Sequence, residues 1–146
     1  MPEGGPYRDV SAPIASRADL DWSRMGGSWT IVQGAAFGPL GQPGAALSLE
    51  IGEAGGEIRI ASPTRTTQIP VEIAGPGRLR ALDRPRELWV LWGDADYRTV
   101  AIGTPDGAFG WIMDRNGASS RDRLEAARTI MDWYGYDLDA LKENGR

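Results

Sequence analysis

Short apolar runs broken by turn residues dominate the middle of this chain. Between Trp29 and about Arg115 the apolar residues come mostly in short runs separated by clusters of Gly, Pro and Asp. This punctuation is typical of β-strands joined by tight turns. The sequence therefore predicts eight strands, at residues 28–33, 45–51, 57–61, 68–74, 78–82, 87–92, 98–103 and 108–115.

The strands differ in how their two faces are composed. Leu47, Leu49 and Ile51 alternate with polar residues, which gives one apolar and one water-facing side. Residues 88–92 (LWVLW) are apolar on both sides, so their outer side needs a cover.

One helix is predicted, at residues 121–134, and it can supply that cover. Ser119 or Ser120 can cap its first turn and Gly135 ends it. Its apolar stripe consists of Leu124, Ala127, Ile130, Met131 and Tyr134, and its water-facing side of Arg121, Glu125, Arg128 and Asp132.

The length of 146 residues fits one domain. We expect a tail or linker at residues 1–18 and the folded domain at 19–146. Eight sequential strands fit a closed up-and-down barrel as well as a sandwich of two four-stranded sheets, and the pattern alone leaves both open.

The composition removes several classes of function. The chain has no His and no Cys, which excludes a Ser-His-Asp triad, a thiolate nucleophile, a thiol or imidazole zinc site and a histidine-ligated haem. Its paired carboxylates are typical of turns and helix surfaces, so we predict no enzyme, no metal and no cofactor. With 16 basic and 20 acidic residues and no basic stripe, nucleic acid is not an expected partner. No apolar run is long enough for a transmembrane segment.

Three local motifs point to one family. Residues 27–29 (GSW) open the first strand, residues 94–97 (DADY) form the turn after the sixth, and Arg115 closes the eighth. Together with the order of elements, these motifs resemble the lipocalin family, and most closely its bacterial members. The resemblance favours the barrel over the sandwich.

The resemblance implies an all-β fold: an eight-stranded antiparallel up-and-down β-barrel (calycin) with one C-terminal helix packed on the outer wall. Trp29 would lie across the closed end with Arg115 stacked on it. Gly27 would permit a close approach of the chain there, and Asp96 and Tyr97 would fix the neighbouring turn. All five positions are expected to hold the fold and not to touch a ligand.

The resemblance also implies non-catalytic binding or transport of a small hydrophobic ligand, such as a fatty acid or lysolipid, by a periplasmic or outer-membrane-associated protein. Counting strand faces from Trp29 and Arg115 predicts the lining, with Thr99, Ala101 and Gly103 also turned inward. The predicted ligand-binding residues are Ile31, Gln33, Leu47, Leu49, Ile58, Ile60, Val71, Ile73, Val90, Trp92, Trp111 and Met113. The alternative is a barrel filled by its own side chains that acts as a protein-interaction module.

Overall fold

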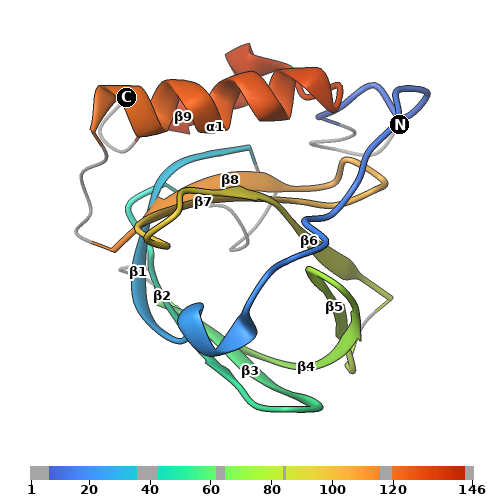
Figure 1. Cartoon of the computed structure of the whole chain (residues 1–146), viewed down its shortest axis with the longest axis vertical. Helices are drawn as coiled ribbons and strands as arrows, with labels where there is room; N and C mark the ends of the chain where they lie inside the picture. The colour runs from blue at the N-terminus through green and yellow to red at the C-terminus, as the bar shows by residue number, and fades with distance from the viewer. Residues whose placement is uncertain (1–6, 36–42, 62–64, 84, 116–119, 144–146) are drawn as a thin grey trace.

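The strands close into a barrel in the computed structural model, which describes residues 7–35, 43–61, 65–83, 85–115 and 120–143. Each strand pairs antiparallel with the next, and β1 pairs with both β8 and β2. This closure confirms the predicted barrel and excludes the sandwich (Figure 1). The strands are β1 Gly27–Ala35, β2 Ala46–Ile51, β3 Gly55–Ala61, β4 Thr66–Gly75, β5 Arg78–Ala81, β6 Glu87–Gly93, β7 Thr99–Gly103 and β8 Gly110–Asp114.

Three short elements were not expected from the sequence. The 3-10 helix η1 (Trp22–Arg24) precedes β1, and η2 (Leu138–Ala140) follows the long helix. The two-residue strand β9 (Lys142–Glu143) pairs with Gln33 and Gly34 of β1. It lies on the side of β1 where the strand pairing with β2 ends, at Thr30.

The helix α1 (Arg121–Trp133) covers the outer face of β6, β7 and β8 (Figure 1). Ser120 is its N-cap and accepts a hydrogen bond from the Arg123 N–H. Gly135 follows with a φ of 93°, a conformation that glycine adopts without strain, so the helix ends there. Arg128 does not lie on a fully water-facing side as predicted, because its guanidinium donates to the Gln33 side chain.

Two apolar clusters divide the core. One fills the barrel, with Trp29 and Trp111 as its largest members. The other lies between the sheet and α1, where Leu91, Ile112 and Met131 meet. The predicted stripe of the helix contributes to this second cluster.

Two predicted lining residues face the helix and not the interior. A register shift in β1 lies between Ile31 and Gln33, and one in β6 lies between Val90 and Trp92. Each such bulge adds a residue and reverses the alternation beyond it. The inward placement of Gln33 and Trp92 is therefore wrong, while Ile31 and Val90, which precede the bulges, face inward as expected.

The face assignment of β7 was also wrong. Val100 pairs with Met113 and Ile102 with Trp111, and directly opposed residues share a face, so Val100 and Ile102 point into the barrel. Ala101 consequently packs in the cluster under the helix.

The two ends of β7 face away from the interior for the same reason. The Thr99 hydroxyl donates to Asp114. Gly103 lies against Tyr136, since a Cβ at Gly103 would come within 2.7 Å of the Tyr136 hydroxyl.

Residues 7–18, which the sequence assigns to a tail, lie along the barrel (Figure 1). The Arg8 guanidinium is buried and donates to the carbonyls of Tyr134, Pro105 and Ala12. Farther along, the backbone N–H of Arg17 donates to the carbonyl of Val90 in β6. Val90 is the residue after Trp89, where the pairing of β6 with β5 ends. Within the described residues, no helix has the length and apolar character needed to cross a membrane.

Candidate ligand-binding interior

The closed end of the barrel is built around Trp29. The Arg115 guanidinium lies 3.8 Å from the centre of the Trp29 ring, as the resemblance predicted. Its N–H groups donate to the carbonyls of Arg24 at 2.7 Å and Gly26 at 2.6 Å. Gly27 has a φ of 100°, and a Cβ there would lie 3.1 Å from the Arg115 side chain. The motif residues Gly27, Trp29 and Arg115 thus hold this end together.

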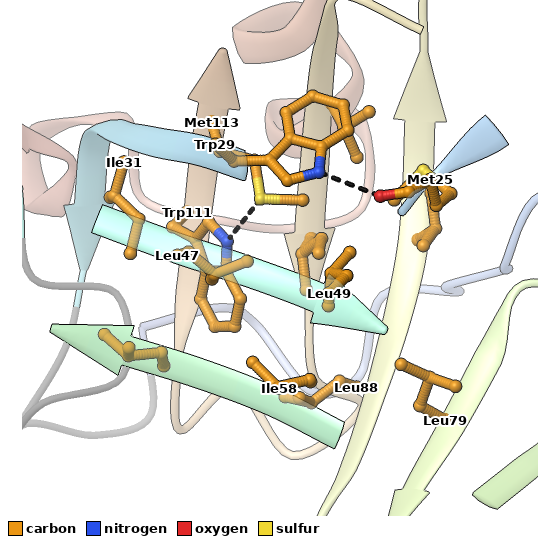
Figure 2. Packing of buried hydrophobic residues seen from close by; sticks show 14 of the residues in the cluster. Met25, Trp29, Ile31, Leu47, Leu49, Ile58, Leu79, Leu88, Trp111 and Met113 are labelled. Atoms are coloured by element: carbon orange, nitrogen blue, oxygen red, sulfur yellow. Dashed lines mark hydrogen bonds between the residues drawn. The ribbon is translucent and has the colours of Figure 1, made fainter. Parts of the chain in front are cut away.

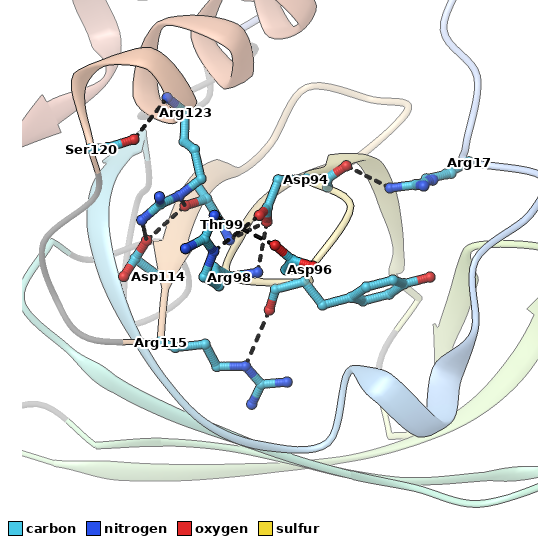
Figure 3. Close-up of polar contacts among 11 residues, drawn as sticks. Arg17, Asp94, Asp96, Arg98, Thr99, Asp114, Arg115, Ser120 and Arg123 are labelled. Atoms are coloured by element: carbon cyan, nitrogen blue, oxygen red, sulfur yellow. Dashed lines mark hydrogen bonds and ion pairs between the residues drawn. The ribbon is translucent and has the colours of Figure 1, made fainter.

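The turn between β6 and β7 completes the closed end (Figure 3). Tyr97 is buried, its hydroxyl accepts from the Asp21 N–H, and Arg24 stacks 4.3 Å from its ring centre. The carboxylate that holds the turn belongs to Asp94, which accepts from the backbone N–H groups of Arg98 and Thr99. Asp96, which the resemblance assigned to fixing this turn, is exposed, and the contact described for its carboxylate is a 3.6 Å ion pair with Arg98.

Burial raises the pKa of Asp94, but the two backbone hydrogen bonds and the contact with Arg98 together outweigh this effect. The pKa of Asp94 therefore lies below its ordinary value. Its carboxylate is therefore ionised at neutral pH and holds the turn through these hydrogen bonds.

Ten of the twelve predicted lining residues belong to the cluster inside the barrel: Ile31, Leu47, Leu49, Ile58, Ile60, Val71, Ile73, Val90, Trp111 and Met113. The sequence prediction omitted Ile69, Leu79, Ala81, Val100 and Ile102 from the lining. For Ile69 a signal was present, because it alternates in phase with Val71 and Ile73. Val100 and Ile102 lie in a strand buried on both faces, where alternation carries no information.

Side chains fill the described part of the interior. Trp29 exposes 1% of its surface, and Trp111 and Met113 expose none. The described cations that reach this cluster lie at its two ends: Arg115, Arg24 and Arg17 lie over Trp29 or Tyr97 at the closed end, and Arg86 lies over Phe109 at the other end. The interior can therefore hold apolar surface, and a molecule that enters has to displace side chains.

Both interior indoles donate a hydrogen bond within the barrel (Figure 2). Trp29 Nε1 donates to the Met25 carbonyl over 2.9 Å. Trp111 Nε1 donates to the Met113 sulfur over 3.4 Å. These are the hydrogen bonds that the structure describes for the two interior indoles.

The loop between β7 and β8 lies at the opposite end, which we call the mouth. There Phe109 packs partly against the interior cluster, with the Arg86 guanidinium 4.8 Å from its ring centre. Arg86 also pairs with Asp106 over 2.5 Å. Tyr136, which packs between α1 and the sheet, fixes the loop between β7 and β8. Its hydroxyl donates to the Phe109 carbonyl and accepts from the Thr104 N–H. Burial raises the pKa of Tyr136, which keeps this hydroxyl protonated.

A polar group of side chains lies outside the barrel beside the start of α1 (Figure 3). The buried Asp114 carboxylate accepts from the Thr99 hydroxyl over 2.6 Å and lies 3.4 Å from Arg123. These contacts tie the helix to β7 and β8. Within the described residues, no group of three or more His, Cys, Asp or Glu side chains is arranged to hold a metal ion.

The comparisons with known proteins agree with this geometry. Residues 45–145 match the model of a protein family described as the lipocalin-like domain. The chain belongs to this family. No curated protein matches the sequence of this lipocalin.

Solved lipocalin structures share the fold at low sequence identity. Insecticyanin from the tobacco hornworm Manduca sexta superposes with a TM-score of 0.66 at 14% identity, covering 92% of this chain and 86% of that one. The cockroach allergen Per a 4 gives 0.65 at 10% identity, covering 92% and 94%. The siderocalin Ex-FABP gives 0.62 at 18% identity, covering 81% and 91%.

Proposed function

We propose that this lipocalin binds a small hydrophobic molecule non-covalently inside its barrel, without catalysing a reaction. The leading ligand class is a molecule with an acyl chain, such as a fatty acid or lysolipid. One observation carries the proposal: the described lining is apolar, and the described cations that contact it, such as Arg115 and Arg86, lie at its two ends. The related siderocalin Ex-FABP is described as functioning through dual ligand specificities, which supports a binding role for the same barrel.

Entry of the ligand requires interior side chains to move. Met113 and Met25 are unbranched, and such side chains change rotamer and repack at small cost. Entry from the mouth also requires Phe109 to shift relative to Arg86. We place the protein in the periplasm or at the outer membrane.

A titration with cis-parinaric acid, a fluorescent fatty acid, tests the proposal. We expect saturable binding with one site per chain, energy transfer from tryptophan, and displacement by decanoate or by lysophosphatidylcholine. Ile102→Phe adds volume inside the barrel and should weaken binding, while Ile130→Phe adds the same volume on the half-buried helix and should not.

Circular dichroism of each variant is the control that tests whether the fold is retained. Absence of saturable binding of all three lipids to the folded protein would overturn the proposal. Equal loss of binding in both variants would place the site outside the barrel.

A second candidate function is a filled barrel that acts as a protein-interaction module. The complete burial of Trp111 and Met113 favours it, as does Trp133, which exposes 77% of its surface on the outside of α1. This candidate predicts that the wild type binds no lipid, whereas Trp111→Ala gains binding because it opens an apolar cavity. Lipid binding by the wild type contradicts it.

A further inference from the structure

The two interior indoles differ in the quality of their hydrogen-bond acceptors (Figure 2). Trp29 donates to a backbone carbonyl, a strong acceptor, at 2.9 Å. Trp111 donates to the thioether of Met113, a weak acceptor, at 3.4 Å. The Trp111 N–H is fully buried, so it gains from a better acceptor if one comes within reach.

The residues directly opposite Trp111 on the two neighbouring strands offer no such acceptor in their side chains. Its directly opposed neighbours are Ile102 on β7 and Gly34 on β1. One is aliphatic and the other has no side chain. Among the described residues, Met113 is therefore the sole hydrogen-bond partner of this N–H, and a bound molecule would supply the next one.

We infer that Trp111 Nε1–H is the donor that orients the bound molecule, and that it takes a neutral acceptor such as an ester or ketone oxygen. The inference rests on the proposed function and narrows its ligand class. Met113 turns away when the acceptor arrives, which its flexible side chain allows. Trp111 is the second residue of β8 from the mouth, so the acceptor group of the ligand lies near the mouth.

The charge of the interior decides between a neutral and an ionised acceptor. The described cations that contact the interior cluster lie at its two ends. At the closed end Arg115 lies over Trp29 and Arg24 and Arg17 lie over Tyr97, and the Arg115 N–H groups are taken by the carbonyls of Arg24, Gly26 and Tyr97. At the mouth Arg86 lies over Phe109 and is already paired with Asp106. A carboxylate placed beside Trp111 would therefore lose its water without gaining an unpaired counter-charge. An ester or ketone loses far less, so acyl esters are favoured over free acids at this depth.

Two probes with the same carbon skeleton test the inference: methyl nonyl ketone, which carries a carbonyl, and undecane, which does not. Binding of the ketone should shift the indole N–H resonance of Trp111 downfield, while undecane should not. Trp111→Phe keeps an aromatic ring but removes the donor. It should lower the affinity for the ketone about three- to tenfold more than the affinity for undecane.

Met113→Leu gives a prediction of opposite sign. It removes the competing sulfur and leaves the Trp111 N–H without its partner, so the affinity for the ketone should rise while that for undecane changes little. Decanoate should bind the wild type more weakly than the ketone when the pH keeps it ionised. Trp133→Phe, a change at the exposed tryptophan, is the control and should alter none of these affinities.

The outcomes separate the inference from the proposed function. If both probes bind but their affinity ratio is the same in the wild type, Trp111→Phe and Met113→Leu, the inference is overturned and the proposed function stands. If neither these probes nor decanoate bind the folded wild type, both are overturned. If Trp111→Phe fails to fold, the resonance shift in the wild type tests the inference instead. The absence of a downfield shift of the Trp111 indole N–H on binding of the ketone would then overturn it.

Discussion

Arg115 combines a stacking contact with several hydrogen bonds at one end of the barrel. Its guanidinium lies over Trp29 and donates to backbone carbonyls of the segment around η1 and of the β6–β7 turn. A planar group with several fixed N–H donors meets these acceptors together, whereas an ammonium group cannot.

Arg115→Ala should therefore lower the free energy of unfolding by about 2–3 kcal/mol, the sum of a cation-π contact and partly exposed hydrogen bonds. Arg115→Lys should restore less than half of that loss. Urea denaturation measures both values. The control is Arg59→Ala, which removes an exposed surface ion pair and should change stability by less than about 1 kcal/mol. An Arg115→Ala protein as stable as the control would contradict the described closed end.

Asp94 gives the stability of the protein a dependence on pH. Its pKa in the folded chain is lowered from the ordinary value of 3.8, so the folded state favours the ionised carboxylate. The resulting stabilisation is present above the unfolded pKa and is lost as the pH falls through the folded pKa. In Asp94→Asn, the loss of stability between neutral pH and about pH 3 should be smaller than in the wild type. Thermal unfolding across this range measures the difference, and identical pH profiles would refute the assignment.

At the scale of elements, the sequence predicted the strands and the helix to within a few residues but misjudged which side chains face inward beyond each bulge. Alternation and turn residues are local signals, and they place β2, β3 and α1 well. Bulges carry no comparable signal. Gln33 and Trp92 were therefore placed on the wrong face, although Ile31 and Val90 in the same strands were placed correctly.

The contacts around Tyr136 explain another part of what the sequence could not predict. Gly103 and Gly110 lie against its ring, and a Cβ at Gly110 would come within 2.6 Å of it. Residues that are far apart in the sequence are in contact here, and no local sequence pattern predicts such a contact. Gly103, which the sequence placed on the inner face, instead makes room for Tyr136 under the helix.

Packing of α1 on the sheet should account for much of the stability of this element. Met131 is fully buried between the helix and the sheet, and Met131→Ala should cost about 2–4 kcal/mol because it leaves a cavity. Trp133, two residues along the same helix, exposes 77% of its surface, so Trp133→Ala should change stability by less than about 0.5 kcal/mol. Chemical denaturation of the pair measures the contrast, and equal effects would contradict the described orientation of α1.

At the scale of the whole molecule, the closed barrel links ligand binding to global stability. A ligand that occupies the interior binds the folded chain and not the unfolded one. At a free concentration one hundred times its Kd it should stabilise the fold by about 2.7 kcal/mol. For a domain of this size the thermal midpoint should rise by roughly 5–11 °C, as calorimetry with methyl nonyl ketone can measure. If the thermal midpoint does not change at a saturating concentration of the ketone, the ketone does not bind a specific site of the folded protein.

We propose that the space enclosed by the eight strands receives an apolar molecule. A crystal structure of the protein with a terminally brominated fatty acid tests this proposal, because anomalous scattering locates the bromine. We expect bromine density inside the barrel, among side chains such as Leu47, Ile58 and Trp111. Bromine found only on the outer surface, with the interior side chains arranged as described above, would contradict it.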